Sequence, residues 1–184
     1  MSQGSTAVQA VSYEIDPAHS RAHFKVRHLM VSNVRGEFSK VTGTVLFDTV
    51  NLSNSKIEAN IDASTINTSE PQRDEHLKSA DFLDVANFPV ITFVSKSFTK
   101  TGADTLKVAG DLTIHGVTKE VVLNVEYSPD EVKDPWGNTK AGASATTKIN
   151  RKDFGLSWNQ TLETGGLLVG EDIHIDLELE LTKK

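Results

Sequence analysis

Histidine is the residue type in this chain that most directly suggests metal chemistry. Three of its six histidines, His19, His23 and His28, fall close together near the N-terminus. Side chains alternate between the two faces of a strand, so the odd spacing of His23 and His28 places them on opposite faces, where they cannot share an ion. His174 and Asp176 do share a face, but it is the charged face of its strand. No His-Glu-x-x-His pattern occurs, and we expect no metal site.

Patterns for nucleophilic catalysis and phosphate binding are also missing. The chain has no cysteine, which excludes disulfides, thiolate nucleophiles and cysteine-ligated zinc. Ser20 adjoins His19, but neighbours on a strand point to opposite faces and cannot form a nucleophile–base pair. The Gly165-Gly166 segment is not followed by the Lys-Ser/Thr of a P-loop. We therefore predict no catalytic residue and a protein that is not an enzyme.

Length and charge narrow the class of protein further. A chain of 184 residues is expected to form one domain, here over 12–184, after a flexible N-terminal segment 1–11. The formal net charge of −6 argues against nucleic acid as a partner. Segment 1–11 lacks the basic residues and the apolar core of a secretory signal. We expect a cytoplasmic protein, or a periplasmic one if a signal peptide has been replaced by Met1.

Apolar and polar residues alternate with period two along most of the chain, which is typical of half-buried antiparallel strands. The last stripe is the clearest, with Ile173, Ile175, Leu177, Leu179 and Leu181 on one face. The same alternation covers 21–27, 41–47, 57–63, 106–114, 117–127 and 141–149. About eight strands follow, with a tight turn at His115-Gly116. We expect an all-β antiparallel barrel, whose closure removes exposed edges; a two-sheet sandwich is the alternative.

One segment breaks this alternation and predicts a short helix over about 70–80. Ser69 is a candidate N-cap, Pro71 suits the first turn, and Gln72 suits a capping box. Asp74 and Lys78, at i and i+4, are spaced to pair. An apolar loop over 82–89 follows and could cover one end of the barrel. The stretch 128–140 and the turn at 164–166 are expected to be loops.

Four phrases along the chain carry a family resemblance. They are HSRAHFKVRH at 19–28, RDEHL at 73–77, LTIHGVTK at 112–119 and INRKDFG at 149–155. In this order and at this spacing they resemble the YceI-like family, from about Tyr13 to the last strand. The resemblance implies a lipocalin-like antiparallel β-barrel of about eight strands, with one short helix, that binds polyisoprenoids or other long lipids.

Whether the barrel is hollow depends on its inward-facing residues. Small residues on the apolar stripes would leave volume: Ala22, Gly36, Gly43, Ala59, Ala63, Gly110, Ala141, Ala143 and Ala145. Large aromatic residues could fill that volume: Phe24, Phe38, Phe47, Phe93 and Trp158. Alternation alone leaves the two possibilities open, because barrels of this size are either packed with side chains or hold one ligand. The family resemblance favours a ligand tunnel.

The resemblance further implies binding, carriage or storage of a long apolar lipid within 12–184, with that lipid as ligand and no other cofactor. Polyisoprenoids, polyprenyl phosphates, isoprenoid quinones and fatty acyl derivatives belong to this class. One alternative is an enzyme acting on a lipid or quinone in the same tunnel; another is a stress-linked interaction protein with a filled core. A transient membrane contact during lipid exchange and a homodimer remain open as further partners.

The candidate ligand-binding residues follow from inward parity and from the four phrases. Predicted wall residues are Phe24, Val26, Phe38, Val45, Phe47, Ile61, Phe82, Ile91, Phe93, Leu112, Ile114, Leu123 and Trp158. Predicted head-group contacts are His28, Arg73, His76 and Arg151. His28 is polar on an otherwise apolar face. For Arg73 and Arg151 the alternative is a salt bridge, to Asp74 or Asp153, that fixes a loop.

Overall fold

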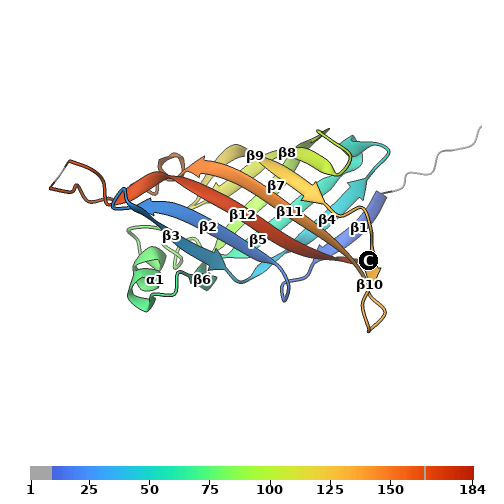
Figure 1. The fold of residues 1–184 in the computed structure, drawn as a ribbon, viewed down its shortest axis with the longest axis horizontal. Helices are drawn as coiled ribbons and strands as arrows, with labels where there is room; N and C mark the ends of the chain where they lie inside the picture. The colour runs from blue at the N-terminus through green and yellow to red at the C-terminus, as the bar shows by residue number, and fades with distance from the viewer. Residues whose placement is uncertain (1–9, 164) are drawn as a thin grey trace, which may run out of the picture.

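The alternating segments form the strands of a closed antiparallel barrel (Figure 1). The computed structural model describes residues 10–163 and 165–184. In spatial order the ring strands are β11 (Thr139–Asn150), β9 (Val117–Tyr127), β8 (Thr105–Ile114), β7 (Val90–Lys100), β5 (Lys56–Asp62), β4 (Val41–Asp48), β1 (Ala10–Ile15) and β12 (Val169–Lys183). Because β12 also pairs with β11, the ring closes, which confirms the eight-stranded barrel and excludes the sandwich.

Four further strands extend this ring. They are β2 (Arg21–His28), β3 (Ser32–Phe38), β6 (Ile66–Asn67) and β10 (Val132–Lys133). The 15-residue β12 pairs with β11 along one edge, whereas its other edge pairs first with β2 and then, near its C-terminal end, with β1. Strands β2, β3 and β6 therefore prolong the wall at one end of the barrel, while β10 pairs with the beginning of β11.

The predicted alternation holds along β8, where the inward-facing residues are buried from Leu106 to Ile114. The tight turn between β8 and β9 is also confirmed. His115 and Gly116 both have positive φ, 54° and 72°, as in a type I′ hairpin turn. Glycine adopts this conformation without steric cost, which makes His115-Gly116 an ordinary connection.

The predicted helix is confirmed as α1 (Pro71–Lys78), but its capping was predicted wrongly. Ser69 has a positive φ of 63° and so lacks the extended backbone of an N-cap. Glu70 is the N-cap instead, and its carboxylate accepts a hydrogen bond from the backbone N–H of Arg73, so Gln72 has no capping-box role. Three short 3₁₀ helices accompany α1: η1 (Leu52–Asn54), η2 (Ala63–Thr65) and η3 (Arg151–Phe154).

The expected Asp74–Lys78 pair does not form. The Asp74 carboxylate accepts hydrogen bonds from the backbone N–H and the hydroxyl of Thr68, at 2.8 and 2.6 Å, and Lys78 meets Glu75 at 3.1 Å. Asp74 thereby ties α1 to the segment before it. Bonds to a backbone N–H and a hydroxyl orient a carboxylate more firmly than an exposed ion pair on the helix surface.

Two predicted boundaries shift in the structure. Strand β1 begins at Ala10, so the end of the predicted flexible segment 1–11 belongs to the barrel and the rest lies outside the described residues. The predicted loop 128–140 contains β10 and the first residues of β11. Of the predicted turn at 164–166, residue 164 lies outside the described residues. Among the described residues, no helix has the length and apolar character needed to cross a membrane.

Strands β4 and β5 approach each other closely at Gly43. It has a φ of +148°, and a Cβ there would overlap the Glu58 backbone and lie 2.8 Å from the Ala59 Cα. We expect Gly43→Ala to lower the free energy of unfolding by about 2–3 kcal/mol, measured by urea denaturation. Gly142→Ala on β11 is the control, because its Cβ would meet nothing within 4 Å and should be tolerated. Equal stability of both variants would contradict this close approach.

Candidate functional site: a cavity inside the barrel

The inward faces of the strands enclose a cavity of about 930 Å³. All the predicted site residues line it: Phe24, Val26, His28, Phe38, Val45, Phe47, Ile61, Arg73, His76, Phe82, Ile91, Phe93, Leu112, Ile114, Leu123, Arg151 and Trp158. Most of these side chains are aliphatic or aromatic. The space is large enough for an extended ligand, at the upper end of the roughly 300–1,000 Å³ typical of small-molecule sites.

Both aromatic rings and small alanine side chains line the interior of the barrel. The rings of Phe24 and Phe93 lie where the side chains of Gly36 and Gly110 would be. These glycines therefore accommodate rings and leave no open volume, contrary to the prediction from the sequence. The missing side chain of Gly43 faces the β5 backbone, and Ala63 is packed in the core. The alanines that line the cavity are Ala22, Ala59, Ala141, Ala143 and Ala145.

Three aromatic side chains meet beside α1, and we call them the aromatic triad: His76, Phe82 and Trp158. The His76 ring is 4.8 Å from Trp158 and 5.1 Å from Phe82, both nearly edge to face. Phe82 and Trp158 are 5.2 Å apart. Edge-to-face packing of this kind contributes about 0.5–1.5 kcal/mol per pair. The aromatic triad therefore joins α1, the loop after it and the loop 155–168 at this end of the cavity.

Arg73 is held in place by the segment that precedes α1. Its Nε donates to the hydroxyl of Thr68 and its Nη2 to the Thr68 carbonyl, both at 2.8 Å. Because Asp74 also binds Thr68, Arg73 is fixed through Thr68 and not by the direct Asp74 salt bridge considered above. Nη1 forms no hydrogen bond to another described residue. The guanidinium is thus positioned with one donor group left over.

Arg151 holds a loop, as the alternative to a head-group contact expected, but through backbone carbonyls and not through Asp153. It is only 1% exposed, and its guanidinium donates to the carbonyls of Leu156, Trp158, Val169 and Gly170. It forms no salt bridge with Asp153 among the described residues, and burial lowers the pKa of its guanidinium. Carbonyl oxygens occupy most of its donors, so Arg151 fixes the loop 155–168 and positions Trp158 within the aromatic triad.

His28 lies at the end of β2, on the same inward face as Phe24 and Val26, as its parity predicted. It is opposite Ser32 on β3 and Val169 on β12. Its imidazole forms no hydrogen bond or ion pair with another described residue. His28 therefore presents polar ring nitrogens to the cavity, which Arg73, His76 and Trp158 also line.

At the end of the barrel away from α1, where β10 lies (Figure 1), the cavity lining includes a polar contact that the sequence did not predict. The Tyr13 hydroxyl donates to Glu131 at 2.7 Å, and Lys183 meets the other oxygen of that carboxylate at 3.0 Å. Burial, and then the bond to Glu131, raise the pKa of Tyr13 to about 12. Since Tyr13 and Glu131 are far apart in sequence, no local pattern indicates this contact. It ties the loop before β10 to β1.

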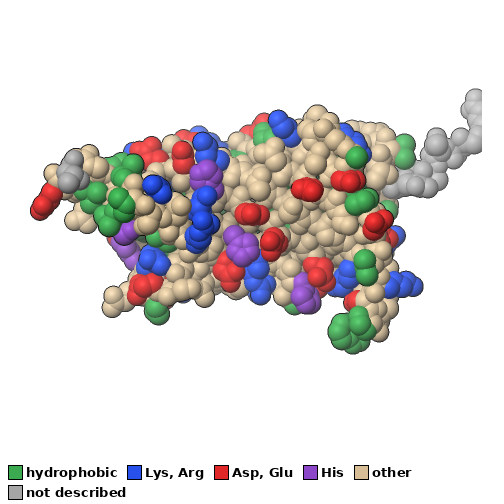
Figure 2. Space-filling model, viewed as in Figure 1, with side chains coloured by type: hydrophobic (Ala, Val, Ile, Leu, Met, Phe, Trp, Pro, Cys, Tyr) green, Lys and Arg blue, Asp and Glu red, His purple; other side chains and the backbone are tan. Residues whose placement is uncertain are grey.

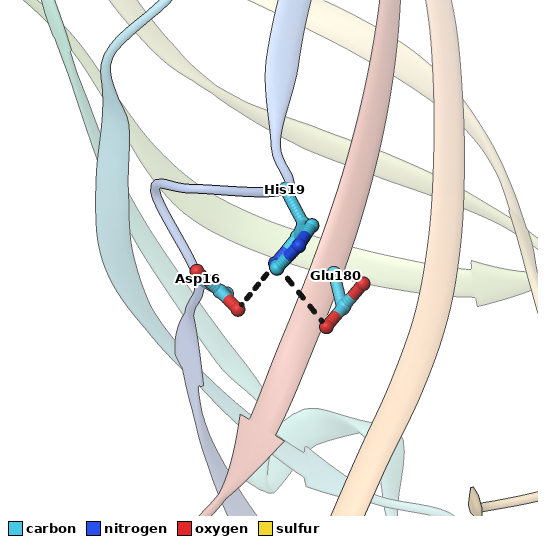
Figure 3. A group of neighbouring side chains, drawn as sticks. All are labelled: Asp16, His19 and Glu180. Atoms are coloured by element: carbon cyan, nitrogen blue, oxygen red, sulfur yellow. Dashed lines mark hydrogen bonds and ion pairs between the residues drawn. The ribbon is translucent and has the colours of Figure 1, made fainter. Parts of the chain in front are cut away.

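One cluster outside the cavity brings potential metal ligands together: Asp16, His19 and Glu180 (Figure 3). The Asp16 carboxylate lies 3.0 Å from His19 Nδ1 and 2.9 Å from Lys140 Nζ. Lys140 also approaches Glu180 at 3.3 Å. The Lys140 ammonium thus supplies the cation that the two carboxylates require. We call these four residues the ionic cluster; it connects the β1–β2 loop to β11 and β12.

The ionic cluster should make stability depend on pH. Hydrogen bonds from His19 and Lys140 hold the pKa of Asp16 well below its usual range, and the bond to Asp16 raises the pKa of His19. The carboxylate's contribution is lost as pH falls through the lowered pKa of Asp16. The contribution of His19 is lost as pH rises through its raised pKa. Both are present between about pH 4 and 6.5, the range bounded by the unperturbed values.

We therefore expect Asp16→Asn to lower the melting temperature by a few degrees, with the largest difference from wild type inside that pH range. Melting curves recorded across pH by circular dichroism measure this difference. Glu126→Gln, at an exposed carboxylate on β9, is the control and should melt like the wild type throughout. A constant difference between Asp16→Asn and wild type at every pH would rule out the titrating contact as its cause.

Sequence comparisons place this chain among bacterial proteins of similar length. The model of the YceI-like domain family matches residues 13–181. A UPF0312 protein of Vibrio cholerae is 36% identical over 177 residues, covering 95% of this chain and 88% of its own. A UPF0312 protein of Staphylococcus aureus is 39% identical over 171 residues, covering 93% and 97%.

Solved structures agree with this relationship. The YceI protein of Campylobacter jejuni is 32% identical with a TM-score of 0.71, covering 87% of this chain and 91% of its own. BcnA of Burkholderia cenocepacia shares the fold at 20% identity, with a TM-score of 0.78 over 90% and 98%. A polyisoprenoid binding domain from Saccharophagus degradans shares it at 17%, with a TM-score of 0.69 over 95% and 99%. From its sequence and its barrel, the chain belongs to the YceI-like domain family.

Proposed function

We propose that this protein binds a long apolar lipid, such as a polyisoprenoid chain, inside the barrel and carries or stores it unchanged. The observation that carries this proposal is the cavity of about 930 Å³ with its mainly apolar lining. The description of the Saccharophagus degradans domain as polyisoprenoid binding supports the same class of ligand. Quinones and acyl lipids have the same apolar chemistry and belong to the proposed class.

The size of the cavity sets the length of lipid that we propose. A water molecule occupies roughly 30 Å³ in the liquid. If each heavy atom of a ligand takes a similar volume, the cavity of about 930 Å³ holds about 30 heavy atoms. At about 0.3 kcal/mol per atom, typical of larger ligands, they would contribute about 9 kcal/mol to binding. This corresponds to a dissociation constant below about 1 μM. Burial of an apolar chain is thus sufficient for useful affinity.

We favour lipid binding without catalysis over the alternative of an enzyme that acts in the same tunnel. A general acid or base works best with a pKa near the working pH. Of the groups that line the cavity near β10, Tyr13 has its pKa raised to about 12, and the hydrogen bond from Tyr13 lowers the pKa of Glu131. Both shifts move away from neutrality, so this pair is suited to holding the loop and not to transferring protons.

The first test is whether the cavity holds lipid. Solvent extraction and mass spectrometry of the purified protein should yield a long-chain lipid. Ala143→Trp should cut the lipid recovered several-fold while changing the melting temperature little, because its indole would occupy the ligand's volume. Ala143 lines the cavity on β11; Thr146, exposed on the same strand, gives the matched control Thr146→Trp. If Ala143→Trp does not fold, Ala59→Trp on β5 replaces it.

Three results would count against this proposal. A wild-type protein that yields no lipid and takes up none from added polyprenol would favour the interaction protein with a filled core. Full lipid retention by folded Ala143→Trp and Ala59→Trp would show that the cavity is not the binding site. Conversion of the added lipid to a product of different mass would favour the enzyme instead.

A second prediction concerns the polar end of the ligand. A phosphate needs hydrogen-bond donors when it leaves water, whereas the apolar tail does not. His28 and the Nη1 of Arg73 are the donors proposed for it, whereas the Nε2 of His76 already lies 2.9 Å from the Asp81 carboxylate. We expect His28→Ala or Arg73→Ala to weaken geranylgeranyl phosphate binding by about 1–3 kcal/mol, the range for a hydrogen bond to a charged group. Binding of geranylgeraniol should change far less.

Fluorescence titration of both ligands at fixed salt measures these losses. Arg35→Ala removes an exposed positive charge on β3, so it controls for general attraction of the phosphate. Equal losses for phosphate and alcohol would mean that His28 and Arg73 support the fold or the tail. If Arg35→Ala lost as much affinity for the phosphate as Arg73→Ala, the loss would come from long-range attraction and not from a hydrogen bond to Arg73.

A further inference from the structure

The turn between β2 and β3 exposes three consecutive apolar side chains. Leu29 is 40% exposed, Met30 54% and Val31 74%. The neighbouring loop 155–168 adds Leu162, Leu167 and Leu168, which are half-buried. Hydrophobic side chains accordingly gather at this end of the molecule, at the left in Figure 2. We call these six residues the apolar tip.

The backbone of this turn makes its composition unusual. Leu29 and Met30 have positive φ, 52° and 62°, and the Val31 N–H donates to the His28 carbonyl at 3.1 Å. Leu29 and Met30 are the central residues of a β-turn inside a three-residue loop, since His28 pairs with Ser32. Two successive positive φ values favour Asn and Gly, and side chains such as Leu and Met are disfavoured there. The two-residue turn at His115-Gly116, which also has two positive φ values, contains glycine. Formation of the hairpin therefore does not explain why Leu29 and Met30 occupy the apolar tip.

Backbone contacts hold the apolar tip in shape. The Leu29 N–H donates to the Leu168 carbonyl at 2.9 Å, and Thr161 pairs with Leu167 within the loop. Side-chain atoms of both Met30 and Leu162 lie about 3.5 Å from the place where Gly166 would carry a Cβ. The two loops thus form one surface. It adjoins the cavity, because Leu168 also lines the cavity, as does His28 at the base of the turn.

Basic residues follow directly behind the apolar tip. Cross-strand pairing aligns Lys148, His174, Lys25 and Arg35 in one row over β11, β12, β2 and β3. We call these four residues the basic row; it is the blue and purple column in Figure 2. Arg27 lies between the basic row and the apolar tip and donates to the Met30 carbonyl at 3.3 Å. Lys148 is the only member of the basic row with an ion pair among the described residues, to Asp172 at 3.8 Å.

The charges near the apolar tip indicate whether a lipid bilayer or a second copy of this chain is the better partner for it. The protein carries a net charge of −6, yet Lys25, Arg27 and Arg35 near the apolar tip form no ion pair with a described residue. The acidic residues nearby in sequence are Glu163 and the pair Glu171 and Asp172, which meet Lys152 and Lys148. Apolar side chains flanked by Lys and Arg match the interface of a bilayer that contains anionic lipids. A second copy of this negatively charged chain offers the basic row less favourable charge.

We propose that the apolar tip inserts into the surface of an anionic lipid bilayer while Arg27 and the basic row face its phosphate groups. This docking rests on the proposed function, because it brings the part of the cavity wall that includes His28 and Leu168 to the membrane from which lipid would enter. The opposite end also exposes an apolar residue, Trp136, at 84%. That end carries Asp130, Glu131 and Asp134 together with Lys133 and Lys183, so it lacks an uninterrupted row of basic residues.

Vesicle flotation tests the docking directly. The full-length protein should float with vesicles of phosphatidylcholine and phosphatidylglycerol, much less with phosphatidylcholine alone, and less at high salt. The double variant Leu29→Asn with Met30→Gly removes apolar side chains while supplying the residues that this turn favours, so it should fold at least as stably. Its vesicle affinity should fall roughly tenfold. Lys25→Glu with Arg35→Glu should reduce binding to the anionic vesicles alone.

Trp136→Ser is the matched control, since it removes an exposed apolar residue from the other end of the barrel and should leave flotation unchanged. Unaltered flotation of the double variant, or a loss with Trp136→Ser instead, would overturn the proposal. So would a wild-type protein that stays off all vesicles but forms a dimer, by light scattering, that the double variant abolishes.

Lipid extraction separates this proposal from the proposed function. A double variant that retains bound lipid yet no longer floats supports docking by the apolar tip. Wild-type protein that floats but yields no lipid, and takes none up, supports docking and contradicts the proposed function. Wild-type protein that holds lipid but does not float contradicts docking alone.

Discussion

Pairing of β12 along both of its edges is the constraint on which the rest of this structure depends. One edge pairs with β11, while the other is divided between β2 and β1. Because the ring closes through this strand, every inward-facing residue of the alternating pattern is turned toward one interior. The same division lets β2, β3 and β6 continue the wall beyond the ring. The extended wall carries His28 and the residues 29–31 of the apolar tip, so closure also determines where these residues lie.

The features that could be predicted from the sequence are those that repeat locally. Alternation identified the inward residues correctly because the side-chain period of a strand is fixed by its geometry. Leu112 and Ile114, for example, are both buried and line the cavity. The His115-Gly116 turn was predictable from its local sequence, because a positive φ favours glycine. The volume of the cavity was not, because Gly36 and Gly110 suggested space that the rings of Phe24 and Phe93 occupy.

Contacts between distant segments could not be predicted. Arg151 binds four carbonyls that its sequence neighbourhood does not reveal, so a salt bridge with nearby Asp153 was the simpler expectation. The ionic cluster escaped notice because Lys140 joins Asp16 across more than a hundred residues. The capping error at Ser69 is of another kind. Thr68 engages both Arg73 and Asp74, and the chain turns there through a positive φ that composition did not indicate.

The two ends of the cavity differ in a way that gives a bound lipid a direction. At one end, Tyr13 and Glu131 hold each other, and the raised pKa of Tyr13 keeps its hydroxyl protonated and committed to the carboxylate. An anionic head group placed there would meet Asp130 and the Glu131 carboxylate, whose hydrogen-bonding capacity Tyr13 and Lys183 already use. At the other end, Arg73 and His28 offer donors without disrupting existing contacts. An amphiphilic ligand is therefore favoured with its tail toward Tyr13 and its head toward α1, the end that also bears the apolar tip.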